Sequence, residues 1–286
     1  MKVLLTGSSS LLGAQVVRQL VQRGDTVRVM QRRPSDVAEE LGLEQHLGEV
    51  VDETVATAAV AGVDTVIHLA ARVGVVGTRK QFFDTNVVGT RVVLAAAQNA
   101  GVQRFVFVSS PSVAHTGTAL AGQGAEAADP RHAKGEYSKS KALAEKEVLA
   151  ADGAGIATIA VRPHLVWGPG DTQLIGRIVE RARQGRLALV AGGRPLIDTT
   201  YLDNAADAVI AAADRAQAGH GRAFIVSNGE PRTVEEMVAR ICEAAGERPP
   251  ERSVPRAAAW AAGAVAETVW KVSGRQDDPP MTRFLA

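Results

Sequence analysis

Short apolar runs alternate with helical patterns along the first 165 residues of the chain. The apolar runs fall at positions 2–5, 26–30, 48–51, 65–69, 105–109 and 156–161, and the helical patterns at 14–23, 52–61, 82–100 and 137–151. This order predicts an α/β fold, a doubly wound parallel sheet with helices on both faces. Ligands of such sheets bind beyond the carboxyl ends of the strands, so we expect the functional residues there.

A turn rich in small residues follows the first strand candidate. Gly7, Ser10 and Gly13 stand where the backbone must bend sharply and approach a ligand, with Leu11 and Leu12 between the last two. The helix that follows would offer free N–H groups and the positive end of its dipole to a pyrophosphate. The turn therefore predicts a Rossmann-like dinucleotide site, although glycine is more usual than serine at position 10. The alternative is a strand–helix turn without a ligand.

The residues after the second strand candidate bear on the choice of dinucleotide. In such folds an acidic residue about 20 positions after the glycine turn binds the ribose 2′-hydroxyl, whereas a nearby arginine accommodates a 2′-phosphate. Gln31 stands at that place, Arg32 and Arg33 follow it, and the first carboxylate after them is Asp36. We therefore expect NADP(H) in preference to NAD(H), with solvated loop arginines as the alternative.

Tyr137 precedes Lys141 by four residues, which places both side chains on one face of a helix. A phenol titrates near ~10, too high for efficient proton transfer at neutral pH. An ammonium one turn away favours the phenolate and lowers the pKa of the phenol. The spacing therefore predicts an acid–base pair, and the alternative is a surface helix with an incidental tyrosine.

Composition points to a soluble enzyme of a reducing compartment, and we expect a cytoplasmic location. The net charge of +1 gives no broad nucleic-acid footprint, and the single Cys242, expected to be buried, excludes an internal disulfide. The six histidines are scattered without ligand spacing, so no metal site is expected. No segment is apolar for the ~18 residues that a membrane span requires, and the first strand leaves no room for a targeting peptide.

Several motifs together resemble the extended short-chain dehydrogenase/reductases, the superfamily of NAD-dependent epimerases and dehydratases. The matching segments are 6–13, 68–71, 86–90, 109–113, 137–141, 162–171 and 197–204. Within that superfamily the chain resembles the branch of 3β-hydroxysteroid and sterol-4α-carboxylate dehydrogenases, which includes bacterial 2-alkyl-3-oxoalkanoate reductases. Such relatives usually continue past a stretch like 281–286, so we expect a shortened C-terminus.

The resemblance implies a catalytic set of Ser110, Tyr137 and Lys141. Tyr137 would be the general acid in ketone reduction and the general base in alcohol oxidation. Lys141 would lower the pKa of Tyr137 and bind the nicotinamide ribose. Ser110 would donate a hydrogen bond to the substrate oxygen, and Ser112 is the second choice for that role.

The resemblance also implies cofactor contacts at the carboxyl ends of the strands. These are Gly7, Ser10, Leu11, Leu12, Gly13, Arg32, Arg33, Glu49, Val50, Ala70, Ala71, Arg72, Asn86, Ser109, Tyr137, Lys141, Arg162 and Pro163. Glu49 and Val50 would flank the adenine, and Arg162 and Pro163 would present backbone to the nicotinamide.

Two polar residues within these motifs, His68 and Asn86, allow a structural role. We expect His68 to be a buried strand histidine without a chemical role. Asn86 has two alternative roles: it holds the active-site loop in place, or it takes part directly in the reaction.

We expect a dinucleotide-binding domain at residues 1–165, to which residues 201–226 return. Residues 166–200 and 227–286 are expected to form a smaller C-terminal substrate-binding lobe. His115, His164 and Trp167 are candidates for the pocket wall, with a core or loop role as the alternative. The alanine-rich stretch 257–272, with Trp260 and Trp270, is expected to cover a hydrophobic pocket. Packing in a homodimer or resting on a membrane surface are its alternatives.

Three function classes compete for this sequence. The first is an NADP(H)-dependent oxidoreductase that moves a hydride to or from a secondary alcohol or ketone on a hydrophobic, steroid-like or 3-oxoacyl substrate. The second is a nucleotide-sugar 4-epimerase with retained NAD; a dehydratase is disfavoured because Ser110–Ser112 lacks the carboxylate pair of such enzymes. The third is a dinucleotide-sensing protein, but such relatives usually lose the tyrosine–lysine pair. We expect the first.

Overall fold

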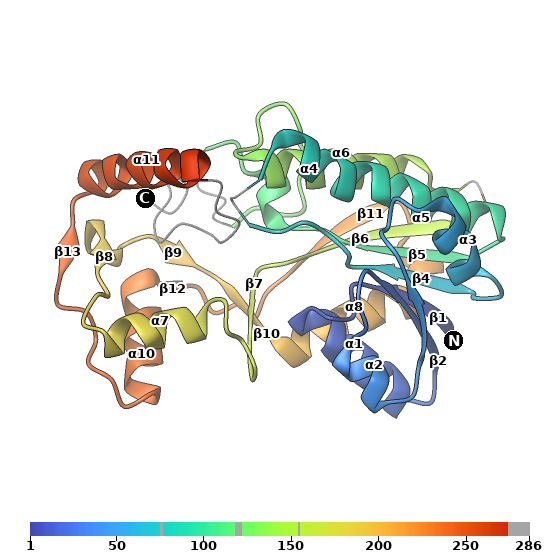
Figure 1. Cartoon of the computed structure of the whole chain (residues 1–286), viewed down its shortest axis with the longest axis horizontal. Helices are drawn as coiled ribbons and strands as arrows, with labels where there is room; N and C mark the ends of the chain where they lie inside the picture. The colour runs from blue at the N-terminus through green and yellow to red at the C-terminus, as the bar shows by residue number, and fades with distance from the viewer. Residues whose placement is uncertain (75–76, 118–121, 154, 274–286) are drawn as a thin grey trace. The chain divides into compact units, whose positions relative to one another are not determined.

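The chain forms two compact units, one of which contains a seven-stranded parallel sheet (Figure 1). The computed structural model describes residues 1–74, 77–117, 122–153 and 155–273. The first unit comprises Met1–Val73, Thr78–Val166 and Thr200–Ser227, and the second comprises Gly74–Gly77, Trp167–Thr199 and the residues from Asn228 on.

The sheet of the first unit has the strand order β11-β6-β5-β4-β1-β2-β3, with all neighbours parallel. Its strands are β1 (Lys2–Thr6), β2 (Thr26–Gln31), β3 (Glu44–Leu47), β4 (Thr65–His68), β5 (Arg104–Val108), β6 (Ala157–Pro163) and β11 (Arg222–Val226). The strand order reverses between β1 and β4, which is where doubly wound sheets bind ligands. The predicted fold class is confirmed.

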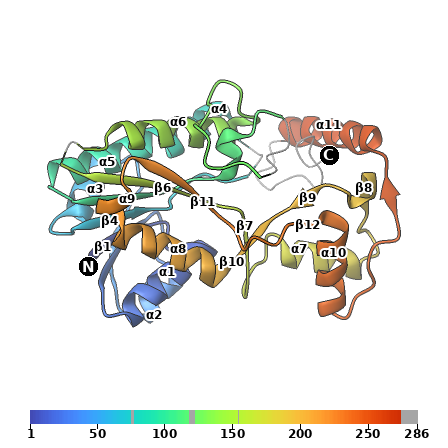
Figure 2. The same cartoon turned by 180° about the vertical axis from the view of Figure 1, so that it is seen from behind.

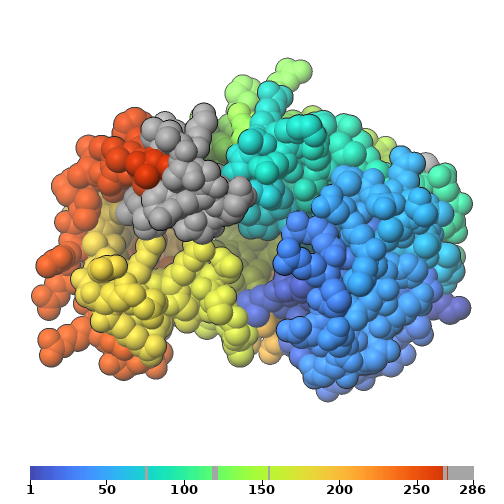
Figure 3. All heavy atoms as spheres, viewed as in Figure 1, coloured from blue at the N-terminus to red at the C-terminus, as the bar shows by residue number. Residues whose placement is uncertain are grey.

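Helices cover both faces of this sheet (Figures 1 and 2). On one face lie α1 (Leu11–Gln22), α2 (Asp36–Glu40), α8 (Leu202–Asp214) and α9 (Ala216–Gly219); on the other lie α3 (Glu53–Val60), α5 (Gly89–Asn99) and α6 (Glu136–Ala150). Strand β1 serves both cores, because Val3 and Leu5 point to the first face and Leu4 to the second. In the space-filling view the N-terminal segments, in blue, form one closely packed block (Figure 3).

Two elements differ from the sequence-based expectation. The third strand is Glu44–Leu47, not 48–51. It is a polar strand at the edge of the sheet, and its conformation comes from pairing with β2, where Arg28 Nε donates to Glu44 Oε2 at 2.8 Å. The expected single helix at 82–100 consists of α4 (Arg79–Phe83), a π-helical turn η1 (Asp84–Val88) and α5. No residue pattern in the sequence indicated the π-turn.

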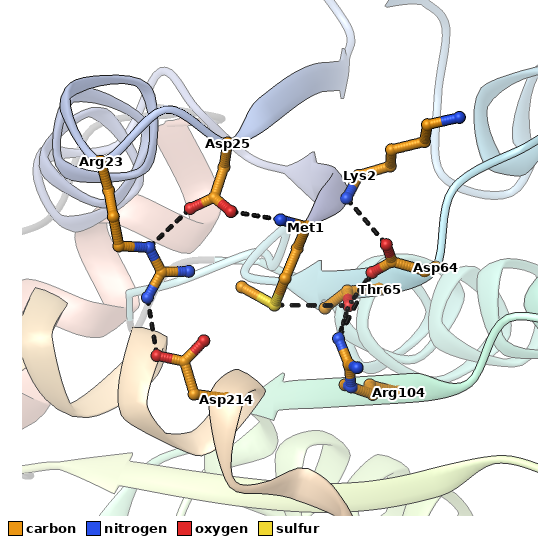
Figure 4. A network of polar contacts seen from close by, with 8 residues as sticks. All are labelled: Met1, Lys2, Arg23, Asp25, Asp64, Thr65, Arg104 and Asp214. Atoms are coloured by element: carbon orange, nitrogen blue, oxygen red, sulfur yellow. Dashed lines mark hydrogen bonds and ion pairs between the residues drawn. The ribbon is translucent and has the colours of Figure 1, made fainter.

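A polar network ties the amino ends of the strands together, at the edge opposite the predicted site (Figure 4). Asp25 accepts from the Met1 amino group and, at 2.7 Å, from Arg23 Nε, while Arg23 Nη1 donates to Asp214 at the end of α8 at 2.6 Å. Asp64 accepts from the Lys2 backbone N–H at 2.9 Å and from the Thr65 hydroxyl at 2.6 Å. These bonds connect β1 and β4 with α1 and α8.

The second unit is smaller and is built around two helices. The chain enters it through β7 (Leu165–Trp167) and leaves it through β10 (Thr199–Tyr201). Its own elements are α7 (Ile175–Arg183), β8 (Leu189–Val190), the 3₁₀ turn η3 (Ala191–Gly193), β9 (Leu196–Ile197), β12 (Arg232–Thr233), α10 (Val234–Ala244), β13 (Ser253–Val254) and α11 (Arg256–Ser273). Ile178, Leu189, Val238 and the buried Cys242 form its core.

Helix α11 coincides with the alanine-rich stretch singled out in the sequence. It exposes Trp260, Val265 and Val269, whereas the Trp270 side chain and residues 274–286 lie outside the described part of the chain. Among the described residues, no helix is both long and apolar enough to cross a membrane.

Candidate active site

The turn after β1 requires glycine at two positions. Gly7 has φ +84°, and a Cβ there would lie 2.9 Å from the Ala70 backbone nitrogen; a Cβ on Gly13 would lie 2.3 Å from the Gly7 carbonyl oxygen. The Ser10 hydroxyl folds back onto the turn, donating to the Gly7 carbonyl at 2.9 Å and accepting from the Gly13 N–H at 3.1 Å. Ser10 is thus the N-cap of α1, which explains why serine is tolerated there.

At the end of β2, the side chain of Gln31 is buried and is hydrogen-bonded through both its oxygen and its nitrogen. It accepts from the Ser8 hydroxyl and donates to Gln45 Oε1 at 2.8 Å. Arg32 and Arg33 are exposed, and neither guanidinium has a side-chain partner among the described residues. The loop therefore presents two unpaired cations beside a neutral amide.

The loops after β3 and β4 contain the next predicted cofactor contacts. Glu49 is exposed, whereas Val50 is 7% exposed. The Val50 side chain packs closely against Gly89, where an added Cβ would lie 2.4 Å from Val50 Cγ2. Ala70 and Ala71 are half-buried, and the Ala70 N–H donates to Thr6 Oγ1 at 3.1 Å. Val50 can therefore offer a ligand its backbone, since its side chain belongs to the core.

Ser110 and Tyr137 are brought together beyond the end of β5. Ser110 caps the 3₁₀ turn η2 (Pro111–Ala114), its hydroxyl lies 2.9 Å from Ser112 Oγ, and it lies close enough to the Tyr137 phenol to affect the pKa of that phenol. The neighbouring Ser109 is 6% exposed, and its buried hydroxyl has no partner among the described residues. Two hydroxyls and a phenol thus gather at one strand end.

Lys141 lies one turn after Tyr137 on α6 and is 2% exposed. Its Nζ atom donates to the Val108 carbonyl at 2.6 Å and lies 3.8 Å from the centre of the Phe107 ring. Burial lowers the pKa of the Lys141 ammonium to about 7, and Glu145 opposes part of that shift.

The pKa of Tyr137 differs from the sequence-based expectation. Burial raises the pKa of the Tyr137 phenol, and the nearby Ser110 hydroxyl opposes only part of that rise. We expected Lys141 to lower it, but in this structure the ammonium bonds the Val108 carbonyl. The pKa of Tyr137 is raised because desolvation disfavours the charged phenolate, just as it disfavours the ammonium form of Lys141.

Asn86 lies in the π-helical turn η1 and is 1% exposed. Its amide nitrogen donates to Ser140 Oγ at 2.9 Å and to the Arg72 carbonyl at 3.1 Å, and its oxygen accepts from the Arg72 N–H at 2.7 Å. Both N–H donors and the oxygen of the amide are thereby engaged within the protein. This arrangement favours the structural reading of Asn86.

His68 is fully buried at the end of β4, between two threonines. Its Nδ1 lies 2.8 Å from Thr6 Oγ1 and its Nε2 lies 3.1 Å from Thr90 Oγ1, which itself donates to the Asn86 carbonyl at 2.7 Å. Burial, and to a lesser extent Lys141, lowers the pKa of His68 to about 3. The ring is therefore neutral at neutral pH, in agreement with a buried strand histidine.

Arg162 and Pro163 end β6, and the Arg162 side chain turns inward. Its guanidinium forms a two-pronged ion pair with Glu145, with Nε donating to Oε2 at 2.9 Å. The Arg162 side chain is therefore not available to a ligand, and Pro163 is half-buried. Among the pocket-wall candidates, His115 and His164 are half-buried in the first unit, and Trp167 donates to Thr199 Oγ1 at 3.0 Å in the second.

A family model describing the 3-beta hydroxysteroid dehydrogenase/isomerase family matches residues 4–256 of this chain. The chain belongs to this family. The resemblance inferred from the motifs is therefore confirmed, and the protein is an oxidoreductase of the extended short-chain dehydrogenase/reductase type.

Curated relatives of this family member span nearly all of it. It is 40% identical to a 2-alkyl-3-oxoalkanoate reductase of Stenotrophomonas maltophilia (strain K279a), over 100% of this chain and 88% of that protein. It is 34% identical to a 3 beta-hydroxysteroid dehydrogenase/Delta 5-->4-isomerase of Mycobacterium tuberculosis (strain H37Rv), over 88% of this chain and 72% of that protein.

Two solved structures with the same fold are complexes with NAD. The protein MoeE5 in complex with UDP-glucose and NAD has a TM-score of 0.78 at 26% identity, covering 89% of this chain and 85% of that one. The UDP-glucose 4-epimerase of Thermus thermophilus in complex with NAD has a TM-score of 0.74 at 25% identity, covering 89% of this chain and 86% of that one. A nicotinamide dinucleotide is therefore the cofactor class of this family member.

The residues of this 3-beta hydroxysteroid dehydrogenase/isomerase family member fit such a dinucleotide. Gly7 and Gly13 leave the turn free of side chains, and the first turn of α1 presents N–H groups beside it. The buried hydroxyl of Ser109 has no protein partner among the described residues, which leaves it for a ligand. Within the described residues no group of three His, Cys, Asp or Glu side chains could hold a metal ion.

Sequence reasoning missed several residues that hold this site. Ser140, Thr6 and Thr90 carry no motif signal, because hydroxyls of this kind are common and their partners are distant in the chain. Glu145 could have been found, since it follows Lys141 by four residues on one helical face.

Proposed function

We propose that the protein is an NADP(H)-dependent reductase or dehydrogenase that interconverts a ketone and a secondary alcohol on a small hydrophobic, steroid-like or 3-oxoacyl substrate. One observation carries this proposal: the Tyr137 phenol lies close enough to the Ser110 hydroxyl for that hydroxyl to lower the pKa of the phenol, and it lies one turn from the buried Lys141. A proton donor, a hydrogen-bond donor and a cation are the groups that carbonyl reduction needs.

The proton transfer would use Tyr137 and Ser110 on one substrate oxygen. When bound, the nicotinamide supplies the hydride for reduction and accepts it in oxidation. Tyr137 would give its phenolic proton to the carbonyl oxygen, and Ser110 would donate a hydrogen bond to the same oxygen. Ser112 can donate to Ser110 Oγ, 2.9 Å away, which leaves the Ser110 proton for the substrate.

Lys141 would bind the nicotinamide ribose and, as an ammonium, favour the phenolate of Tyr137. Its pKa of about 7 means that both charge states are populated near neutral pH. Reduction would therefore slow as the pH rises through that value, because the neutral amine no longer favours the phenolate.

The preference for NADP(H) rests on the loop after β2. Arg32 and Arg33 have no partners among the described side chains, and guanidinium groups match the geometry of a phosphate. Gln31 is held by Ser8 and Gln45 and places no negative charge beside them. Both features suit a 2′-phosphate.

We further propose that residues 1–165 and 201–226 bind the cofactor, and that 166–200 and 227–286 bind the substrate. The relatives named for 3-oxoalkanoates and 3-hydroxysteroids support a hydrophobic hydroxy or keto substrate. A 3-oxoacyl compound is favoured, because the reductase is the more similar of these two relatives.

The test is a screen of NADPH oxidation and NADP⁺ reduction with ketosteroids, 3-oxoacyl compounds and nucleotide sugars. We expect turnover with a hydrophobic ketone, and Tyr137→Phe should abolish it while leaving cofactor affinity nearly unchanged. Full activity in Tyr137→Phe would remove the phenol from the mechanism. NAD that stays bound during purification, with sugar interconversion and no net redox change, would instead indicate the epimerase.

A further inference from the structure

Three buried charged side chains lie together beneath the candidate active site. Among the described residues that are buried as a whole, Lys141 and Arg162 are the cations and Glu145 is the carboxylate, with 2%, 1% and 1% exposed. Arg162 Nε donates to Glu145 Oε2 at 2.9 Å and Nη2 donates to Oε1 at 2.5 Å. Charged side chains are rarely buried so fully unless they are paired.

Lys141 and Glu145 share one face of α6. Tyr137, Lys141 and Glu145 follow one another at intervals of four residues, so each lies one turn from the next. The polar partner of Lys141 Nζ is the Val108 carbonyl, which is neutral. Glu145 is therefore the nearest buried anion on the helix that carries Lys141, and Arg162 holds both of its oxygens.

Other titratable or charged groups on α6 and on the segments packed around it are either neutral or at least partly exposed to solvent. They are Tyr137, Glu136, Lys139, Lys146 and Glu147 of α6, His68 of β4, Arg104 of β5, Arg79 and Lys80 of α4, Asp84 of η1, Arg91 of α5, and Arg72 and Glu126 of the loops. Asp84 pairs with Lys80 and Arg91 pairs with Glu147 at positions that remain in contact with solvent, which screens them.

We propose that the buried Glu145–Arg162 pair is a positioning device that sets the charge state of Lys141, with Glu145 favouring the ammonium and Arg162 limiting that effect. This inference rests on the proposed function only where it concerns catalysis. Glu145 and Arg162 would not touch substrate or cofactor through their side chains and would act through Lys141.

The sign of each effect follows from Coulomb attraction in a poorly solvated interior. Removing the Glu145 charge leaves two buried cations, so the ammonium of Lys141 becomes less favourable. Removing the Arg162 charge leaves Glu145 unpaired beside Lys141, so the ammonium becomes more favourable. A pair with a purely structural role would produce no such opposite shifts.

Arg162 also ties this pair to the segment that leads into α6. Its Nη1 atom donates to the Glu126 carbonyl at 2.8 Å, ten residues before the helix begins at Glu136. The same guanidinium thus bonds the neighbour of Lys141 and the loop that precedes Tyr137. Loss of Arg162 would therefore loosen this loop as well as change the charge.

The test compares Glu145→Gln, Arg162→Met and the double variant. The control is Arg91→Met, which breaks the ion pair between Arg91 of α5 and Glu147 of α6 on the same face of the sheet. The titration of Lys141 is followed by NMR of ¹⁵N-labelled lysine side chains, with the signal assigned by its loss in Lys141→Met. We expect its pKa to fall by about one unit or more in Glu145→Gln, and to rise by a similar amount in Arg162→Met. Arg91→Met should leave it unchanged.

The double variant covers the case in which a single substitution prevents folding, because removing both members of a buried pair is often tolerated. Its Lys141 pKa should lie between those of Glu145→Gln and the wild type. An unchanged Lys141 pKa in every variant that folds, or shifts of one sign in both single variants, would overturn the inference.

The pH profile of kcat for ketone reduction separates this inference from the proposed function. The basic limb should move to lower pH in Glu145→Gln and to higher pH in Arg162→Met, in step with the NMR titration. If the NMR titration shifts and the kcat profile does not, the pair sets the charge of Lys141 but Lys141 has no part in catalysis. That outcome contradicts the proposed function alone.

Discussion

The side-chain amide of Asn86 donates to the Ser140 hydroxyl at 2.9 Å, joining residues 54 positions apart. Ser140 donates in turn to the Tyr137 carbonyl at 2.8 Å, and Asn86 also bonds both backbone groups of Arg72. One amide in a π-helical turn therefore fixes the first turn of α6 and the loop after β4. π-Turns often occur at functional sites, and here the turn directs Asn86 toward the helix that carries Tyr137.

Replacing Asn86 with Asp tests this link. The carboxylate keeps the acceptor for the Arg72 N–H but loses both donors and faces the Arg72 carbonyl. We expect the free energy of unfolding to fall by about 1–3 kcal/mol and kcat to fall by about tenfold to a hundredfold. Denaturant titration and steady-state kinetics measure these changes, with Asn99→Asp at the exposed end of α5 as the control. An unaltered kcat would show that Tyr137 is positioned without Asn86.

Ser110 and Ser112 form a matched pair of variants, because their hydroxyls share one hydrogen bond of 2.9 Å. Ser110→Ala should lower kcat by about a hundredfold or more, since it removes a hydrogen-bond donor for the developing oxyanion. Ser112→Ala should have a much smaller effect. Single-turnover rates of both variants decide between them, and the reverse order would assign the donor role to Ser112.

The double variant Arg32→Ala/Arg33→Ala tests the preference for NADP(H). It should raise the Kd for NADPH by about tenfold to a hundredfold and leave the Kd for NADH nearly unchanged, because only NADPH carries the 2′-phosphate. Nicotinamide fluorescence titrations measure both constants, and the exposed Arg215→Ala serves as the control. Equal losses for both cofactors would rule out the phosphate assignment.

Gly13→Ala tests the close approach of the phosphate-binding turn. Its Cβ would lie 2.3 Å from the Gly7 carbonyl oxygen and 2.8 Å from Ser10 Oγ, so the turn must shift. We expect a lower melting temperature and a loss of dinucleotide affinity. Gly124→Ala is a matched control, because its Cβ meets nothing within 4 Å. Calorimetry with and without cofactor gives both quantities, and normal affinity in Gly13→Ala would move the cofactor site elsewhere.

The ion pairs of Asp25, at the amino ends of the strands, make the stability of the protein depend on pH. Burial alone would raise the pKa of this carboxyl, but hydrogen bonds from Arg23 and the Met1 amino group outweigh it, and the pKa lies below its ordinary value of 3.8. A lowered pKa in the folded state stabilises the protein above the unfolded pKa, and that contribution disappears as the pH falls through the folded value.

Asp25→Asn should therefore lower the free energy of unfolding by about 1–3 kcal/mol at pH 7. The difference from the wild type should shrink as the pH falls below the ordinary pKa of 3.8. Urea titrations at neutral and acidic pH measure both values. A difference of the same size at both pH values would mean that charge is not the source of the stabilisation.

The order of strands and helices in the first unit was predictable from the sequence, because burial on both faces leaves apolar runs that local patterns reveal. The edge strand β3 was misplaced, since Glu44–Leu47 is polar and owes its conformation to pairing with β2. The π-turn at Asp84–Val88 was not predicted, because it depends on the contacts of α4, η1 and α6 rather than on local propensity.

The sequence by itself determined the parallel sheet, the glycine turn after β1, the membership of the family and the identity of the candidate groups Ser110, Tyr137 and Lys141. These follow from short-range spacing, which a linear chain displays directly. Only the tertiary structure decided that Lys141 is desolvated, that Tyr137 has a raised pKa, and that Arg162 turns inward to Glu145. Burial and charge pairing depend on which distant segments surround a side chain, and that information exists only in the folded chain.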